Sequence, residues 1–159
     1  MPGAVPVPSL SGPATSSAID RLTHRGTPDR VRIWPIVRCM LAIAGAKRAL
    51  RRRGLTRTLS ALRRRYDLGP GVELDPLAIA AADHIVAVAA AFYPGRAHCL
   101  ERSLVLYGHL CRLGAVPDFR LGVQAAPFAA HAWVAYHGTP VNDSAEHVAH
   151  FAVVSETRP

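Results

Sequence analysis

Cys99, His131 and Asp143 are of the types that cleave amide bonds by nucleophilic catalysis. Cys99 follows a Pro-Gly loop and stands at the expected N-terminus of a helix. Unpaired N–H groups and the positive end of the helix dipole favour a thiolate there. The same N–H groups can hold the oxyanion of a tetrahedral intermediate. Cys99 is therefore a candidate nucleophile, and the alternative is a small buried core residue.

His131 is the candidate base, at the start of an expected strand whose alternate residues share a face. A three-residue hairpin loop, His137–Thr139, pairs Tyr136 with Pro140. That register sets Asp143 diagonal to His131, within reach of a hydrogen bond. An acid that orients a base completes the triad of a thiol protease. A different loop length puts Asp143 on the other face, where it only caps the turn.

The spacing of apolar residues predicts the elements that must position these side chains. Spacings of three and four indicate helices over residues 29–49, 55–66, 76–92 and 99–113. Asp75 before Pro76 suits a helix start, and Gly54 suits an αL cap at a helix end. The third helix is mostly apolar, so we expect it to be buried. Later the period falls to two, which indicates strands at 119–124, at 131–136, from 141 and at 151–154. Helices followed by antiparallel hairpin strands make an α+β fold.

Charge divides the chain into unequal parts. Residues 21–65 hold 14 of the 19 Lys and Arg residues and one acid, whereas residues 66–159 hold five basic and nine acidic residues. The first 18 residues are rich in Pro, Gly, Ser and Ala and show no period. We therefore expect a disordered arm over residues 1–20, a basic helical docking region over 21–70, and a domain that carries the candidate triad over 71–159.

The composition predicts a soluble cytoplasmic protein. Half of the residues are hydrophobic, which excludes wholesale disorder. Three scattered cysteines are too few for a secreted disulfide framework. The N-terminus lacks the basic and apolar regions of a signal peptide. Arg38 and Lys47 interrupt the longest apolar stretch, Ile33–Leu50, so we expect no transmembrane segment.

Several short sequence motifs follow one another between residues 85 and 154. They are Cys99-Leu100 with Arg102-Ser103-Leu104, then Leu121-Gly122-Val123, then Pro127-Phe128 before Ala130-His131-Ala132-Trp133-Val134, and Val141-Asn142-Asp143. In this order and spacing they resemble the lasso peptide leader peptidases, which are transglutaminase-like, papain-related cysteine proteases. The basic helical region ahead of them also suits that family. The resemblance implies a papain/transglutaminase-like core, with the cysteine at a helix N-terminus packed on a small antiparallel sheet.

The resemblance also implies a reaction and partners. A ribosomally made precursor peptide is cut between leader and core, with Cys99 as nucleophile, His131 as general base and then acid, and Asp143 fixing the His131 tautomer. The reaction needs no cofactor and no metal. A separate ATP-dependent lasso cyclase then joins the freed core N-terminus to a side chain of the core. Little sequence precedes the helices, so we expect a separate leader-binding recognition protein as a partner.

Four other residues have competing interpretations. Arg102 and Trp133 are candidates for contacts with the substrate. Trp133 shares the His131 face, so it either shields the catalytic pair, contacts the peptide, or simply packs. His147 and His150 lie three positions apart and are either metal ligands or solvent-facing side chains.

The basic region has two interpretations. It either docks on the core and on a partner or binds a polyanion, and the absence of base-reading motifs and interleaved aromatics favours docking over nucleic acid.

Two functions other than the peptidase stay open. One is a non-catalytic docking protein in which Cys99 is structural, as we expect for Cys39 and Cys111. The other is an acyl or amide transferase, because an amine can resolve a thioester as water does.

Overall fold

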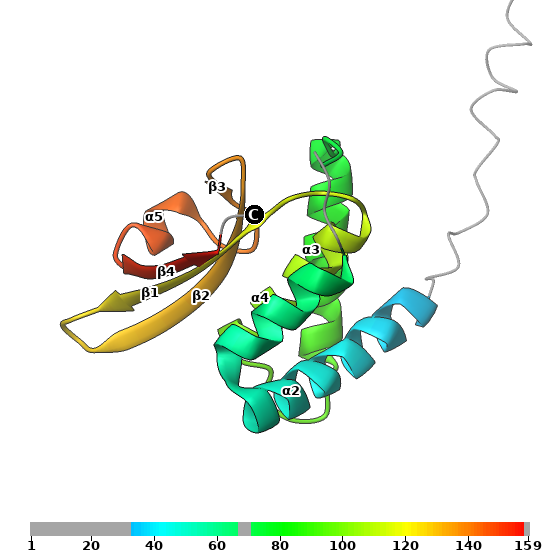
Figure 1. The fold of residues 1–159 in the computed structure, drawn as a ribbon, viewed down its shortest axis with the longest axis horizontal. Coiled ribbons are helices and arrows are strands. Elements are labelled where there is room, and N and C mark those ends of the chain that lie inside the picture. The colour runs from blue at the N-terminus through cyan, green and yellow to red at the C-terminus, as the bar shows by residue number, and fades with distance from the viewer. Residues whose placement is uncertain (1–32, 67–70, 158–159) are drawn as a thin grey trace, which may run out of the picture. The chain divides into compact units, whose positions relative to one another are not determined.

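The structure, a computed structural model, describes residues 33–66 and 71–157. The predicted disordered arm lies outside these residues. The elements are α2 (Ile33–Arg65), α3 (Pro76–Ala91), α4 (Cys99–Arg112), β1 (Asp118–Gln124), β2 (Ala129–Tyr136), β3 (Thr139–Pro140), α5 (Ala145–Val148) and β4 (Ala152–Thr157). Figure 1 shows α2, α3 and α4 gathered beside the sheet. The predicted α+β class is confirmed.

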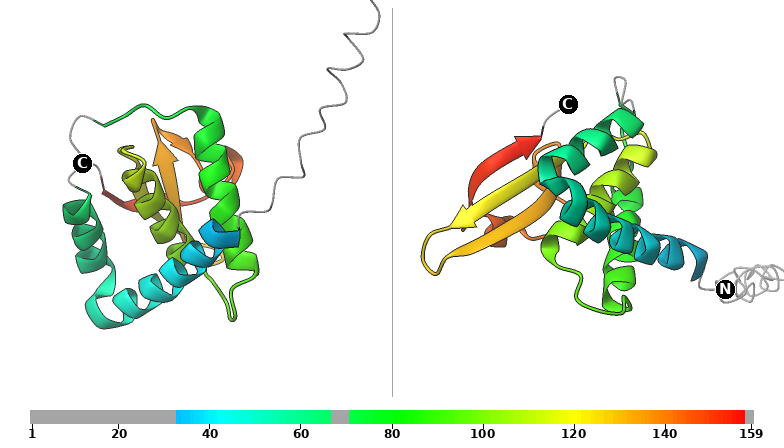
Figure 2. Two further views of the ribbon diagram at one scale, coloured as in Figure 1. Left: turned by 90° about the vertical axis from the view of Figure 1, so that its right-hand side faces the viewer. Right: turned by 60° about the horizontal axis from the view of Figure 1, so that its bottom comes forward.

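Helix α2 bends at Gly54, where we predicted the break between two helices. Gly54 has φ 73° and ψ 176°, so its conformation is not the αL cap that the sequence suggested. This region of backbone space is open to almost no residue except glycine. The Thr58 hydroxyl donates to the Gly54 carbonyl at 2.7 Å and closes the first turn after the bend. The bend gives α2 two arms, which Figure 2 shows in its left view.

The basic arms of α2 share a core with the rest of the domain. Cys39, Ile43 and Leu59 belong to one buried cluster together with side chains of α3, α4 and the sheet. The boundary that we expected between residues 70 and 71 stays a prediction. Within the described segments, no helix combines the length and the apolar character that crossing a bilayer requires.

Helix α3 begins as the sequence predicts. Asp75 is its N-cap and accepts a hydrogen bond from the Leu77 backbone N–H at 2.7 Å. Our expectation that the helix is buried holds for one face only. Ala82, Val86 and Ala89 form one buried stripe at helical spacing, whereas Leu77 is 78% exposed. The stripe faces the core, Ile79, Ile85 and Ala90 are partly buried against it, and the rest of the helix surface is more exposed.

The sheet has the order β3-β2-β1-β4, and all neighbouring strands are antiparallel. Along β2, Ala132, Val134 and Tyr136 point into the core cluster shared with the helices. His131 and Trp133 therefore point to the opposite face, since side chains alternate along a strand. Strand β4 confirms the last predicted strand and pairs with β1 at the far edge.

The hairpin after β2 differs from our prediction by one residue. Tyr136 pairs with Thr139, so the loop has two residues, His137 and Gly138. Their φ angles of 49° and 82° are both positive, as a type I′ turn requires. This turn matches the twist of the flanking strands better than the three-residue loop that we expected.

The strand that we expected from residue 141 is nearly absent. β3 stops at Pro140, and the chain bends through residues 141–143. The short helix α5 follows and was not predicted. Ser144 caps it by accepting a hydrogen bond from the His147 N–H at 3.1 Å.

Gly54→Ala should destabilise the protein by about 1–3 kcal/mol, because alanine is strained at this φ and ψ. The matched control is Gly45→Ala in the regular part of the same helix, where a Cβ meets nothing within 4 Å. That change should stabilise the protein by about 0.5–1 kcal/mol through helix propensity. Urea unfolding measures both free energies, and equal effects of the two substitutions would contradict the strained bend.

Candidate active site

The N-terminus of α4 carries Cys99 as its first residue. Its N-cap, His98, makes no capping hydrogen bond with its side chain. The side chains of Asp75 and Ser144, in contrast, cap α3 and α5. Within the described residues, the first N–H groups of α4 are therefore left without a side-chain acceptor. An open helix N-terminus of this kind attracts an anionic group such as a thiolate or an oxyanion.

His131 and Asp143 form a hydrogen bond of 2.6 Å between Nε2 and Oδ2. Their side chains are only 17% and 19% exposed. An ionised carboxylate only accepts hydrogen bonds, so Nε2 carries the proton and Nδ1 is the basic nitrogen. The second carboxylate oxygen of Asp143 accepts from the Ser144 N–H at 2.8 Å. Asp143 is thus fixed from two sides and holds the imidazole in one tautomer.

This pair forms by a different route from the one that we predicted. The observed register, continued past Pro140, would set Asp143 opposite Ala132 and on the helix side of the sheet. Instead, Asn142 Oδ1 accepts a hydrogen bond from the Val134 N–H at 2.8 Å. In a continued strand, a backbone carbonyl would accept this hydrogen bond. The chain is then free to bend, and Asp143 turns toward His131.

A buried serine links α4, β2 and this bend. Ser103 is fully buried, and its hydroxyl donates to the Ala132 carbonyl at 2.8 Å. The same oxygen accepts a hydrogen bond from Asn142 Nδ2 at 3.0 Å. Because Asn142 also holds β2 through Val134, the three segments are locked together by side-chain hydrogen bonds.

The same link connects the helix that carries Cys99 to the strand that carries His131. Cys99 lies one helical turn before Ser103, on the same face of α4, with about 5–6 Å between the two Cβ atoms. Ser103 in turn binds the carbonyl of Ala132, the residue next to His131. Helix α4 thus contacts β2 one turn after Cys99. Among the described residues, the Cys99 thiol makes no hydrogen bond to His131.

Aromatic side chains surround the His131 ring. Trp133 stacks on it at 5.9 Å and 15° between planes, and Phe151 and His147 approach at 5.2 Å each. Gly122, the β1 partner of His131, leaves room for this packing, because a Cβ there would lie 2.7 Å from Phe151 and 2.9 Å from Trp133. Trp133 is only 2% exposed. It therefore forms the wall behind the ring, and not a surface open to a peptide.

His147 lies closer to this pair than the sequence indicated, and His150 does not join it. The possible ligand atoms of His131, Asp143 and His147 lie within 4.8 Å of one another. The bonded pair, however, is 2.6 Å apart, whereas two ligands of a tetrahedral zinc lie about 3.3 Å apart with bonds of about 2.0–2.2 Å. The observed geometry therefore fits a shared proton and not a shared zinc ion.

Arg102 of α4 lies near enough to Asp83 of α3 for its positive charge to act on that carboxyl. Burial raises the pKa of the Asp83 carboxyl, and the positive charges of Arg102 and His84 partly offset this rise. Arg102 itself is half-buried. Its proposed contact with the substrate stays a prediction.

The other two cysteines lie in the core, as expected. Cys39 is 4% exposed, and burial raises the pKa of its thiol. Burial also raises the pKa of the Cys111 thiol to about 11, an effect that a hydrogen bond with Tyr107 partly offsets. Both side chains therefore remain protonated thiols at neutral pH, whereas Cys99 is half-exposed at a helix N-terminus.

Sequence reasoning gave no role to three residues that shape the site: Ser103, Asn142 and Phe151. One of them carried a usable signal. Ser103 follows Cys99 by four positions, which places both on one helix face. The roles of Asn142 and Phe151 depend on the bend and on the β4 pairing, for which the sequence holds no comparable pattern.

Residues 39–156 match the transglutaminase-like superfamily over most of the chain. The chain belongs to this superfamily. No curated protein and no solved structure matches the chain significantly. The superfamily is consistent with thiol chemistry of the cysteine-protease or acyltransferase type.

At pH 8, iodoacetamide should label Cys99 at least tenfold faster than Cys39 or Cys111 in the folded protein. The reason is that thiolates react, and burial disfavours them at the other two positions. Peptide mapping by mass spectrometry measures the three rates. Equal rates in the folded protein would contradict the assignment, and in urea the three rates should converge.

Ser103→Ala should cost about 1–3 kcal/mol of stability, because it leaves the buried Ala132 carbonyl and Asn142 amide without their partner. Ser60→Ala is the matched control, since the Ser60 hydroxyl donates a hydrogen bond to the Thr56 carbonyl on an exposed helix face. The control should change the free energy of unfolding by less than about 0.5 kcal/mol. Urea unfolding that shows equal effects would contradict the locking role of Ser103.

Proposed function

We propose that this protein is a cysteine peptidase that removes the leader from a ribosomally made lasso precursor peptide. The superfamily supplies the fold and the thiol chemistry. The choice of peptidase and of substrate rests on the sequence phrases around Cys99, His131 and Asp143, which resemble the lasso peptide leader peptidases.

The observation that carries the proposal is the 2.6 Å hydrogen bond between His131 and Asp143, and the open N-terminus of α4 at Cys99 supports it. A histidine with a purely structural role would need neither a carboxylate partner on one ring nitrogen nor an unbonded second nitrogen. The carboxylate holds Nε2, so Nδ1 remains a base. Cys99 is the nucleophile on the adjoining helix turn.

In the first half of the reaction, His131 accepts the proton of the Cys99 thiol, and the sulfur attacks the scissile carbonyl carbon. The oxyanion that forms is held by backbone N–H groups, including that of Cys99. The imidazolium then gives its proton to the leaving nitrogen, and the C–N bond breaks. The core peptide departs with a free amine, and the leader remains as a thioester on Cys99.

In the second half, His131 accepts a proton from water, and the resulting hydroxide attacks the thioester carbonyl. The C–S bond breaks, the leader leaves as a carboxylic acid, and the proton returns to the Cys99 sulfur. Asp143 stabilises the imidazolium in both halves. General acid–base assistance of this kind is worth about 10²–10⁴-fold in rate.

The freed core amine is the group that a separate ATP-dependent cyclase needs for macrolactam formation. Delivery of the precursor by a separate leader-binding protein completes the proposal. A transferase would use the same thioester but resolve it with an amine in place of water.

Incubation with the precursor peptide encoded beside this protein, in H₂¹⁸O and with or without the candidate leader-binding protein, tests the proposal. Mass spectrometry should show the core with a free amine and the leader acid with one ¹⁸O atom. Cys99→Ala should lower the rate by at least about a thousandfold, because the residual site lacks its nucleophile.

Cys111→Ala is the matched control, since that thiol is buried in the core and stays protonated. It should keep cleavage within a few-fold of the unmodified protein. Cleavage that survives Cys99→Ala would contradict the nucleophile assignment. A leader amide formed with an added amine, and no leader acid, would identify a transferase instead.

A further inference from the structure

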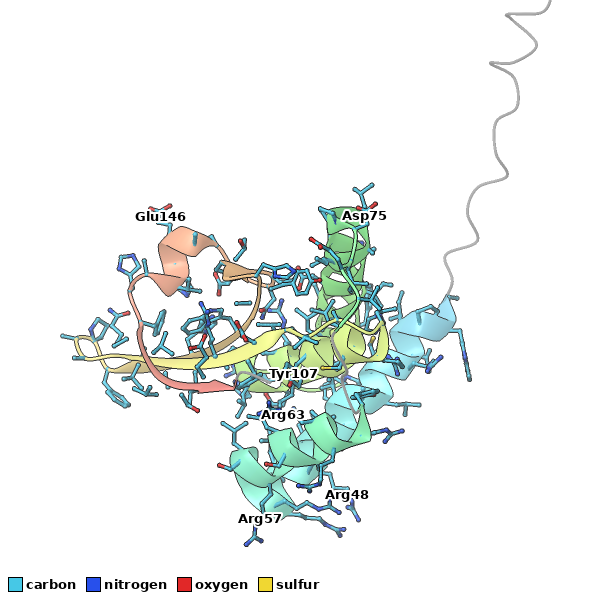
Figure 3. The ribbon with its side chains drawn as sticks, turned by 45° about the horizontal axis from the view of Figure 1, so that its top comes forward. Arg48, Arg57, Arg63, Asp75, Tyr107 and Glu146 are labelled. Atoms are coloured by element: carbon cyan, nitrogen blue, oxygen red, sulfur yellow. The ribbon has the colours of Figure 1, made fainter. Side chains whose placement is uncertain are left out.

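All the charged residues of helix α2 are basic. It carries ten basic residues and no acidic residue. Figure 3 shows Arg48 and Arg57 pointing from α2 away from the sheet. A cluster of one sign attracts and retains an oppositely charged partner. The charge alone does not say whether that partner is a peptide, a nucleic acid or a lipid surface.

A groove of about 470 Å³ lies between the two arms of α2 and helix α4. Its floor is apolar, with Leu104 and Val105 of α4 buried there. Leu41 on its rim is 67% exposed. The groove is thus a concave apolar surface, set within the basic arms.

Cations line the mouth of this groove. Arg38, Arg65 and Arg112 are exposed there, and within the described residues Arg38 and Arg65 form no ion pair. Arg112 donates a hydrogen bond to His109 Nδ1 at 3.1 Å. Burial, then Arg112 and Arg38, lower the pKa of His109. The imidazole therefore stays neutral, while the arginines keep their charge free for a partner.

We propose that this groove binds an acidic peptide segment with at least one aliphatic or aromatic side chain. The apolar side chain fills the groove, and the carboxylates meet the arginines at its mouth. A nucleic acid would leave the apolar floor unused, because phosphates need only the cations. A bilayer would not reach a concave floor, since interfacial helices insert a convex apolar face.

Two features separate this surface from the candidate active site and from the chain's own N-terminus. Cys99, His131 and Asp143 do not line the groove, so the proposal is independent of the cleavage reaction. Residues 1–32 contain four arginines and two aspartates. Their net positive charge does not complement the arginines at the mouth.

The test uses the full chain with Cys99→Ala, so that no turnover disturbs binding. The probe is a fluorescein-labelled peptide of 18 residues with leucines at every third or fourth position and glutamates between them. Two counterparts replace all glutamates by glutamine or all leucines by serine. Fluorescence anisotropy at 50 mM NaCl should give a dissociation constant at least tenfold lower for the acidic leucine peptide than for either counterpart.

Gly45→Leu fills the groove in the same chain. A Cβ at Gly45 meets nothing within 4 Å, so the branch point of the new side chain has room, and leucine favours the helix. This change should weaken binding of the probe at least tenfold. Ala44→Leu is the matched control, because Ala44 is exposed on the same helix but does not line the groove. It should leave the dissociation constant within twofold.

Circular dichroism and urea unfolding establish that both variants are folded. If Gly45→Leu is not folded, Arg38→Glu makes the same test and should weaken the probe at least fivefold. The proposal is wrong if no acidic leucine peptide binds more tightly than its counterparts, or if Ala44→Leu weakens binding as much as Gly45→Leu. It is also wrong if a single-stranded oligonucleotide or a phosphatidylserine vesicle binds instead and is lost on Gly45→Leu.

Discussion

The hydrogen bond between His131 and Asp143 is the constraint on which the rest of the candidate site depends. It fixes which imidazole nitrogen carries the proton, and it leaves Nδ1 as the base. It also requires the chain to leave the ladder after Pro140, because a continued strand would point Asp143 to the wrong face. The short β3, the bend and the capped helix α5 are the local structures that meet this requirement.

Buried hydrogen bonds connect that geometry to α4, the helix of the candidate nucleophile Cys99. Ser103 and Asn142 join α4 to β2 and to the bend in an interior where unmade hydrogen bonds are costly. The helix cannot slide along the strand without breaking them. Cys99 lies one helical turn before Ser103, so these hydrogen bonds also fix the helix that carries it. The arms of α2 also pack against α4 and supply a basic surface.

The sequence predicted the helical segments of α2, α3 and α4 and the α+β class because apolar periodicity and capping residues are local signals. Asp75 and the break at Gly54 are examples, since a side chain or a backbone angle decides each of them. The contact between His131 and Asp143 was expected, but through the wrong register. A hairpin of two rather than three residues is settled by strand twist and by Asn142 replacing a ladder partner. Such competition between tertiary contacts does not affect the spacing of apolar residues, so the sequence pattern could not predict it.

The most direct test of the account is the ¹⁵N NMR spectrum of His131, assigned with a His131→Gln variant and recorded before and after alkylation of Cys99. The account predicts that neutral His131 carries its proton on Nε2, and that alkylation shifts the Nδ1 resonance because the modified sulfur borders that nitrogen. A proton on Nδ1, or a His131 spectrum that alkylation leaves unchanged, would contradict it.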